Sequence, residues 1–310
     1  MQVLLAQPRG FCAGVTRAID IVERALARYG APVYVYHEIV HNHRVVNDLR
    51  LQGAVFVDTL DQVPSGAHIV FSAHGVSGAV EAQARAKALQ LLDATCPLVS
   101  KVHQQAQRFE RLGYTLVMIG HAGHQEVRGT MGRVRSPMHL VSHAADVAAL
   151  PLPANARVAY VTQTTLSLDD TLEVIAALQQ RFPDIVGPQV DDICYATQNR
   201  QVAVRDLADR VQVVLVVGAR NSSNSNRLRE VAQRSGVQAH LVQDASEMDN
   251  GWFDGVTRVG VTAGASTPEP LVQQVVDTLQ SLQPGPVLQL PGVQERVSFR
   301  LPAELAQEAG

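Results

Sequence analysis

The stretch Asp93-Ala94-Thr95-Cys96-Pro97-Leu98-Val99 joins a short apolar strand pattern, Leu89 to Leu92, to a helical pattern that runs to Leu112. The chain has two other cysteines, and both stand at the same kind of junction. Cys12 lies between the strand pattern Val3-Leu4-Leu5 and a helical pattern over 15–29. Cys194 lies between the strand pattern Val190-Asp191-Asp192-Ile193 and a helical pattern over 198–211. Each cysteine therefore marks the point where a strand ends and a helix begins.

The pattern continues beyond each cysteine with the same order of elements. After the helix comes a β-rich strand that ends in a polar loop, and then a further strand that ends in a second polar loop. The first loops hold His41-Asn42, 120–126 and 221–224, and the second loops hold 72–75, 162–165 and 262–266. Counted from the preceding cysteine, His41, His124 and Ser222 lie 29, 28 and 28 residues on. Matched spacing of this kind indicates a structural unit that is repeated three times.

The repeat predicts an α/β fold of three similar units. Strands that alternate with helices form parallel sheets with right-handed crossovers. The third unit lacks the strand that should close it, and residues 1–11 provide a spare one. We therefore expect three parallel-sheet units around a pseudo-threefold axis, with the site at the centre. The expected boundaries are 13–96, 97–193, 194–282 together with 1–12, and a C-terminal tail over 283–310 with a strand at Val297-Ser298-Phe299 and no evident chemistry.

The composition is that of a mildly acidic globular chain. Of its 310 residues 46% are hydrophobic and 18% are charged, which suits a chain that buries a core. A formal charge of −3 and a pI near 6.4 argue against a nucleic-acid-binding protein, which usually carries a basic stripe. No apolar run approaches the roughly 20 residues of a membrane span. Because three cysteines without an export signal argue against a disulfide framework, we expect a soluble, cytoplasmic protein.

The three cysteines are candidate ligands of one metal centre. In parallel α/β units ligands bind beyond the carboxyl ends of the strands, so Cys12, Cys96 and Cys194 would converge if those ends face inward. Each also lies at a helix N-terminus, whose dipole favours the thiolate. Spacings of 84 and 98 residues match no zinc finger, whereas thiolates are the usual ligands of iron–sulfur clusters. A [4Fe–4S] cluster on three cysteines leaves one iron open to substrate; the alternative is that all three are buried and behave as small hydrophobic residues.

The polar loops provide candidate ligands for an anion such as phosphate. Imidazoles, hydroxyls and backbone N–H groups beside helix N-termini form sites of this kind. The candidates are His41, His74, His124, Thr164, Ser222, Ser223, Asn224 and Ser266. The Ser/Asn run over 221–226 is also typical of a flexible linker, but it lies between an apolar strand and a predicted helix over 227–234, which its residues can cap. No Walker or G-x-G-x-x-G motif indicates ATP or NAD.

Glu126 is the candidate proton donor. It lies two residues after His124, in the polar loop over 120–132, close enough to serve the same ligand. A glutamate in a loop is usually solvated, but beside an anion site it is the natural general acid.

At the level of whole motifs, residues 1 to about 282 resemble the 4-hydroxy-3-methylbut-2-enyl diphosphate reductase (LytB/IspH) family. The motifs around the cysteines are 8–15, 93–99 and 191–197, and those in the loops are 72–77, 124–126, 162–167 and 221–226. One departure is Gln125, where proline is common in the family.

The resemblance implies a reductive dehydroxylation, the last step of the methylerythritol phosphate route to isoprenoids. The substrate's allylic hydroxyl would bind the open iron of a [4Fe–4S] cluster, one per subunit, held by Cys12, Cys96 and Cys194. Its diphosphate would lie among the candidate anion ligands of the loops. Two electrons, delivered singly by ferredoxin or flavodoxin, and protons relayed through Glu126 and Thr164 would expel water. The products would be isopentenyl and dimethylallyl diphosphate.

Two other classes of protein remain open from the residues alone. One is a cluster-bearing redox or oxygen sensor that binds a phosphorylated metabolite, and the other is a structural protein with three thiolates on zinc. Glu126 favours an enzyme, because a sensor needs no proton donor beside its ligand. The colour of oxygen-free protein separates zinc from iron, since zinc–thiolate is colourless and a [4Fe–4S] protein is brown.

Overall fold

The structure is a computed structural model that describes residues 1–188 and 192–306. Within these residues the strands form three sheets, and every strand pairing in them is parallel. The chain divides into two compact units. The first is made of residues 1–15, 41–45 and 195–297, and the second of 16–40, 46–194 and 298 onwards. The predicted class, an α/β fold with three parallel sheets, is confirmed.

The sheet of the first unit is completed by the N-terminal strand, as the repeat predicted. Its strand order is β10-β9-β11-β1-β12. The bounds are β1 (Gln2–Leu5), β9 (Val213–Val217), β10 (Gln238–Val242), β11 (Arg258–Ala263) and β12 (Val287–Gln289). β1 pairs with β11, with Val3 opposite Val259. The apolar β1 thus takes the place of the strand that the third repeat lacks.

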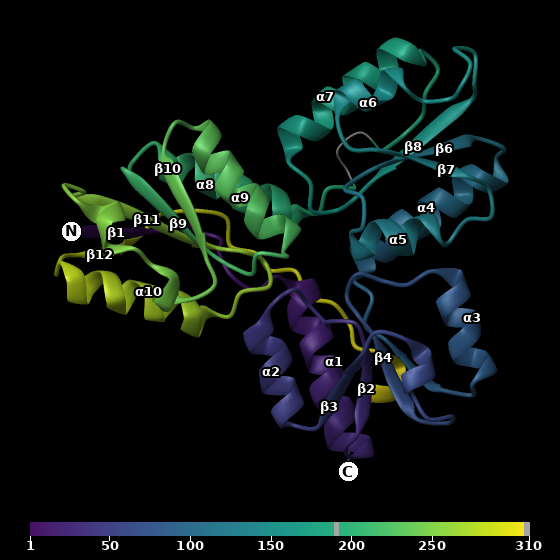
Figure 1. Ribbon diagram of the computed structural model, residues 1–310, viewed down its shortest axis with the longest axis horizontal. Helices are drawn as coiled ribbons and strands as arrows, with labels where there is room; N and C mark the ends of the chain where they lie inside the picture. Colours follow the sequence, from purple (N-terminus) through teal and green to yellow (C-terminus); the bar gives the residue numbers. More distant parts are fainter. Residues whose placement is uncertain (189–191, 307–310) are drawn as a thin grey trace. The chain divides into compact units, whose positions relative to one another are not determined.

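Helices cover both faces of this sheet (Figure 1). They are α8 (Tyr195–Ala208), α9 (Ser223–Arg234) and α10 (Glu269–Leu282), with the 3-10 helices η2 (Ala245–Glu247) and η3 (Asn250–Phe253). Successive strand residues point to opposite faces, so Val213 and Leu215 pack with α10, whereas Val214 and Val216 pack with α8 and α9. A strand buried on both faces needs apolar residues throughout, which explains the unbroken valine-rich run of β9.

The second unit contains a four-stranded sheet of order β3-β2-β4-β5 and a three-stranded sheet of order β7-β6-β8. The strands are β2 (Val33–Tyr36), β3 (Ala54–Val57), β4 (His68–Phe71), β5 (Gln90–Asp93), β6 (Thr115–Ile119), β7 (Met138–Val141) and β8 (Val158–Thr162). The helices in this part of the sequence are α1 (Ala13–Tyr29), α2 (His43–Leu51), α3 (Gly78–Ala86), α4 (Pro97–Arg111), α5 (Gln125–Met131), α6 (Ala144–Ala148) and α7 (Leu168–Arg181), with η1 (Leu60–Gln62). The three-stranded sheet packs one face on α6 and α7 and the other on α4 and α5. The core therefore fixes α4 and α5, which follow Cys96 and His124 directly.

Three local predictions are wrong. Residues 297–299 form no strand, because the tail pairs with β1 earlier, through β12, and ends in the short helix α11 (Ala303–Ala306). The loop predicted over 120–132 contains α5. The helix predicted to begin at residue 227 begins at Ser223, as α9; Ser222 caps it by accepting a hydrogen bond from the Ser225 N–H, which agrees with the predicted capping role of the Ser/Asn run.

One further prediction falls partly outside the described residues. A strand was expected over residues 190–193, before Cys194. Val190 and Asp191 lie outside the described residues, and Asp192 and Ile193 are not in a strand.

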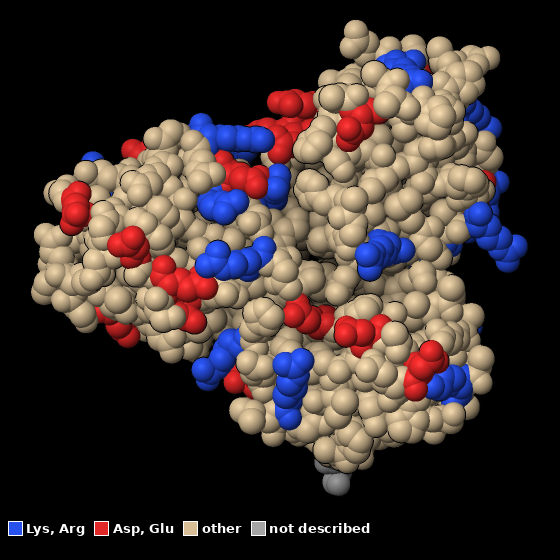
Figure 2. All heavy atoms as spheres, in the orientation of Figure 1, with Lys and Arg blue, Asp and Glu red and all other residues tan. Residues whose placement is uncertain are grey.

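The surface carries both signs of charge. On the face drawn in Figure 2, basic and acidic side chains are interspersed. Mixed charge of this kind is typical of a globular protein surface. Among the described residues, no helix combines the length and the apolar character that crossing a membrane requires.

Candidate active site

Each cysteine lies at the start of a helix, as predicted. Cys96 is the N-cap of α4, and Cys12 and Cys194 directly precede α1 and α8. All three are partly exposed and none forms a disulfide. The thiolate is the form of cysteine that binds metals.

The three cysteines are held by the same backbone hydrogen bond. In each case the cysteine N–H donates to the carbonyl of the second residue after a strand. The pairs are Cys96 with Ala73 after β4 at 3.0 Å, Cys194 with Thr164 after β8 at 3.1 Å, and Cys12 with Ala265 after β11 at 3.1 Å. These carbonyls belong to the second polar loops of the repeat. The repeat therefore extends from residue spacing to hydrogen bonding at each thiol.

The chemistry of the cysteines fits an iron–sulfur cluster. Cys12 belongs to the first unit, and Cys96 and Cys194 belong to the second. Among residues 1–188 and 192–306, no three His, Cys, Asp or Glu side chains gather around one metal-ion position. Three thiols at helix N-termini nevertheless provide the ligand type that iron–sulfur clusters use. Beside Cys96, the buried hydroxyl of Thr95 has no hydrogen-bond partner in the described structure, so a polar group there is left for a ligand.

Glu126 is a buried carboxyl at the start of α5. Only 1% of the residue is exposed. Its Oε1 accepts a hydrogen bond from the Thr164 N–H at 2.6 Å, and its Oε2 accepts one from the Thr164 hydroxyl at 3.0 Å. Burial raises the pKa of Glu126 to about 7, and the two bonds from Thr164 oppose part of that rise. A carboxyl with this pKa exchanges its proton readily at neutral pH.

The second unit brings four of the predicted site residues together. The rings of His74 and His124 lie edge to face with centroids 6.0 Å apart. His124 is the N-cap of α5, and its Nδ1 accepts from the Glu126 N–H at 3.2 Å. Through Thr164, whose carbonyl accepts from Cys194, the acid is linked to a cysteine loop. Glu126 therefore contacts His124 directly and is linked to the Cys194 loop through Thr164.

The first unit brings the other predicted anion ligands together at the start of α9. Ser222 is the N-cap, and Ser223 and Asn224 are the first two residues of the helix. The Ser266 hydroxyl donates to the His41 carbonyl at 3.0 Å. Asn224 is buried, and its Nδ2 has no hydrogen-bond partner within the described residues. A buried amide donor at a helix N-terminus is suited to an anion.

Several buried polar residues near these loops were not predicted. Gln163 is fully buried, and its Oε1 accepts from the His121 N–H at 3.1 Å. Asp192 is buried beside the second unit's strand end, where it accepts from the Thr162 N–H. Arg200 in α8 is fully buried. The first two stand inside the motifs 162–167 and 191–197 that the sequence singled out, but Arg200 lies beyond them.

The comparisons with known proteins cover almost the whole chain. Residues 3–280 match the family described as LytB protein. The 4-hydroxy-3-methylbut-2-enyl diphosphate reductase 2 of Bradyrhizobium diazoefficiens is 59% identical to this chain, over 99% of each sequence.

Two solved structures are similar to this chain. The E-1-hydroxy-2-methyl-but-2-enyl-4-diphosphate reductase of Plasmodium falciparum matches with a TM-score of 0.94 and 38% identity, over 98% of this chain and 96% of that one. An (E)-4-hydroxy-3-methyl-but-2-enyl diphosphate reductase, described as the terminal enzyme of the non-mevalonate pathway, matches with a TM-score of 0.64 and 32% identity, over 90% of this chain and 99% of that one. Sequence and fold agree along nearly the full length, and the chain belongs to the LytB family.

Proposed function

We propose that this chain reduces (E)-4-hydroxy-3-methylbut-2-enyl diphosphate to isopentenyl diphosphate and dimethylallyl diphosphate. Two electrons and two protons enter, the allylic C–O bond breaks, a C–H bond forms and water leaves. The relatives and solved structures reported above are reductases of this substrate by name and match nearly the whole chain. The observation that carries the chemistry is the buried Glu126 carboxyl, with a pKa raised to about 7 and two hydrogen bonds from Thr164.

A cluster is the proposed redox cofactor. Enzymes of the LytB family are iron–sulfur proteins. We infer that Cys12, Cys96 and Cys194 hold one [4Fe–4S] cluster per chain, with one iron left without a protein ligand. When bound, the cluster would supply single electrons and Lewis acidity for the cleavage of the allylic C–O bond. The inference is supported by the shared placement of the three thiols, each at a helix N-terminus with the same backbone hydrogen bond.

The polar loops are the proposed diphosphate site. At the start of α9, the unpartnered Nδ2 of Asn224 can donate to a phosphate oxygen, and the positive end of the helix dipole favours the negative charge. The full proposed set is His41, His74, His124, Thr164, Ser222, Ser223, Asn224 and Ser266. Neutral donors dominate this set, so hydrogen bonding and the helix dipole would hold the charge rather than lysine or arginine.

Glu126 and Thr164 are the proposed proton path. Water is a far better leaving group than hydroxide, so the hydroxyl must receive a proton as its bond to carbon breaks. A carboxyl whose pKa is about 7 is half protonated at neutral pH and can regain its proton between turnovers. The Thr164 hydroxyl, 3.0 Å from Oε2, is the neighbour through which a proton can pass.

The electrons must come from another protein. A one-electron carrier, ferredoxin or flavodoxin, is the proposed donor, because the substrate accepts two electrons and a single cluster passes one at a time.

The test is to replace each cysteine by serine in oxygen-free protein. Each variant should lose most of its visible absorption and bound iron and sulfide, together with the formation of both products from the hydroxylated diphosphate. Ser281→Ala is the control, since it alters an exposed residue of α10 and retains every thiol. Colourless wild-type protein that contains zinc would contradict the cluster. A brown wild-type protein that binds the diphosphate without reducing it, given excess reductant, would identify a sensor instead.

A further inference from the structure

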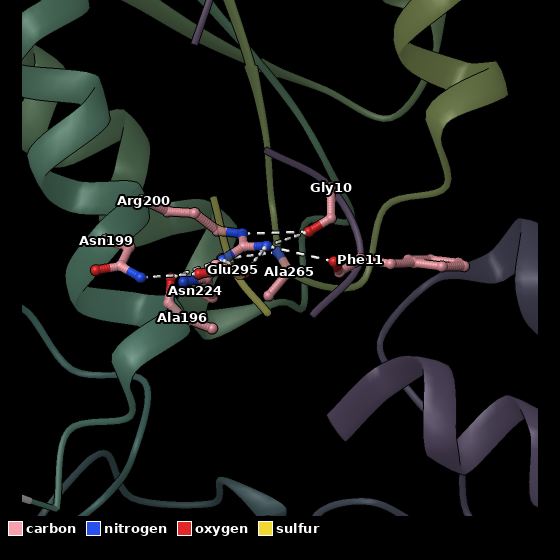
Figure 3. Close-up of polar contacts among 8 residues, drawn as sticks. All are labelled: Gly10, Phe11, Ala196, Asn199, Arg200, Asn224, Ala265 and Glu295. Atoms are coloured by element: carbon pink, nitrogen blue, oxygen red, sulfur yellow. Dashed lines mark hydrogen bonds and ion pairs between the residues drawn. The ribbon is translucent and has the colours of Figure 1, made fainter. Parts of the chain in front are cut away.

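The fully buried guanidinium of Arg200 links the Cys12 loop to the C-terminal tail (Figure 3). Its side chain is 1% exposed. Nη2 donates to the carbonyl of Gly10 at 2.8 Å and to that of Phe11 at 3.4 Å, and Nε donates to Gly10 at 3.2 Å. The two carbonyls belong to the residues immediately before Cys12. One side chain therefore holds the backbone that presents this thiol.

The opposite side of the guanidinium is bound by Glu295. Nη1 donates to the two carboxylate oxygens at 3.0 and 3.2 Å, and Nη2 donates to Oε2 at 3.2 Å. The Asn199 amide donates to the same carboxylate at 3.0 Å. The Glu295 side chain is only 13% exposed, so solvent screens the pair little. A buried guanidinium without a carboxylate is strongly unfavourable, so the position of Arg200 depends on Glu295.

The tail reaches Arg200 along a defined path. β12 pairs with β1, and the Leu290 N–H then donates to the Leu5 carbonyl at 2.9 Å. At Gly292 the two backbones are so close that a Cβ would collide with the Gln7 carbonyl. The tail thus runs beside residues 3–7, and Glu295, which follows this stretch, binds the guanidinium of Arg200. This contact was not predicted, since the tail shows no motif in the sequence.

The Cys12 loop is also held from its other side. The Cys12 N–H donates to the Ala265 carbonyl, and the Ala265 N–H donates to Oδ1 of Asn224 at 2.9 Å. Asn224 is a proposed diphosphate ligand at the start of α9. The loop therefore lies between a fixed ion pair on one side and a substrate-binding residue on the other. Arg200 and Glu295 do not belong to the proposed reaction path, yet they set the backbone of one of its ligands.

We propose that Arg200 and Glu295 are a positioning pair, through which the C-terminal tail holds Cys12 in the geometry that binds the cluster. The proposal rests on Cys12 being a cluster ligand. It predicts that loss of the pair loosens the Cys12 loop and leaves the loop around Cys96 unchanged, because Cys96 is held by a separate backbone bond to Ala73.

Glu295→Gln is the main test. It keeps the size of the side chain but removes its charge. The control is Glu304→Gln, the same change at an exposed position of the same tail. Glu295→Asp serves as a milder second variant if the first does not fold, because it keeps the charge but is too short to bind Arg200 and Asn199 together. Folding of each variant is checked by circular dichroism.

The first measurement is hydrogen–deuterium exchange of the full-length, cluster-bearing chain. In Glu295→Gln, or in Glu295→Asp if that replaces it, exchange over residues 9–13 should accelerate at least about ten-fold, with 93–99 unchanged. The second is alkylation of each cysteine, resolved by mass spectrometry, after iron is removed by an anaerobic chelator. Cys12 should gain reactivity relative to Cys96, which acts as the internal standard because Arg200 and Glu295 do not contact its loop.

Three results would overturn the proposal. They are unchanged exchange over 9–13 in the folded variant, an equal acceleration around all three cysteines, and an equal effect in Glu304→Gln. Neither measurement uses substrate, so a chain that fails to reduce the diphosphate would leave this test valid.

Discussion

The perturbation that tests the chemistry most directly is Glu126→Gln. The substitution keeps the shape of the side chain and an oxygen that can accept from the Thr164 N–H. The NH₂ group of the glutamine can donate a hydrogen bond to the Thr164 hydroxyl, which acts as the donor in the wild type and would act as the acceptor in the variant. The helix α5 and the His124 cap should therefore remain in place, while the acidic proton is lost.

The expected size of the effect follows from burial. An exposed glutamate with the ordinary pKa of 4.5 would be about 0.3% protonated at pH 7, whereas a pKa of about 7 makes Glu126 about half protonated. Burial thus increases the acid form on the order of 100-fold at neutral pH. Positioned general acids contribute about 10²–10⁴-fold to rate, so we expect Glu126→Gln to slow turnover at least about 10²-fold.

The assay is single-turnover reduction with excess chemical reductant, measured from pH 6 to pH 9. In the wild type the rate should fall about five-fold between pH 7 and pH 8, because the protonated fraction falls from about a half to about a tenth. Glu126→Gln should lose this decline, since glutamine does not titrate. Iron and sulfide content and affinity for the diphosphate should match those of the wild type.

Near-normal turnover in Glu126→Gln with an intact cluster would refute the argument. The proton would then come from a histidine or from water. A wild-type rate that stays constant from pH 7 to pH 9 would refute the assignment of the pKa.

The remaining predictions concern the surroundings of this acid and of the cysteine loops. Thr164→Val removes a bond that lowers the pKa of Glu126, so the decline in rate should move to higher pH, whereas Thr164→Ser should leave it in place. Because the pKa of Glu126 is raised on folding, its contribution to stability is complete below pH 4.5 and is lost as pH rises through 7. Urea unfolding should therefore show about 2–3 kcal/mol less stability at pH 8 than at pH 5, and Glu126→Gln should remove that difference. Gly75→Ala places a Cβ 2.6 Å from Cε1 of buried His103 at a φ of +74°, so it should cost about 1–3 kcal/mol more in urea unfolding than Gly113→Ala, which has a φ of +76° and open space. An equal cost at the two glycines would show that the backbone, and not the contact, decides the penalty.

The fold could be predicted because the sequence repeats its own pattern. The strands after the Cys96 and Cys194 helices could be predicted, because β6 and β9 are buried and almost wholly apolar. The pairing of β1 with β11 joins residues more than 250 positions apart. That the N-terminal strand completes the third unit could be predicted, because that unit lacked a strand and residues 1–11 provided one.

Other features depend on contacts that the sequence does not display. Glu126 was predicted as an acid, but its pKa depends on complete burial and on Thr164, which lies 38 residues away. The start of α9 was predicted four residues late, because serine and asparagine have low helix propensity and the cap at Ser222 outweighs it. The pair of Arg200 and Glu295 spans 95 residues, and neither residue stands in a recognisable motif.

The three repeats share one backbone hydrogen bond at the cysteine but carry different side chains around it, and these side chains give the repeats different roles. Each cysteine N–H donates to the second residue after a strand, and those residues are Ala73, Thr164 and Ala265. Among these three residues Thr164 has a hydroxyl, and that hydroxyl donates a hydrogen bond to Glu126. The third is held by Asn224. A shared hydrogen bond can therefore set three thiols alike, while the residue at the same position adds a proton path in one repeat and a link to the anion site in another. Ala265→Thr should therefore leave the Cys12 loop in place, as judged by hydrogen–deuterium exchange over residues 9–13, because the carbonyl that holds the loop is unchanged.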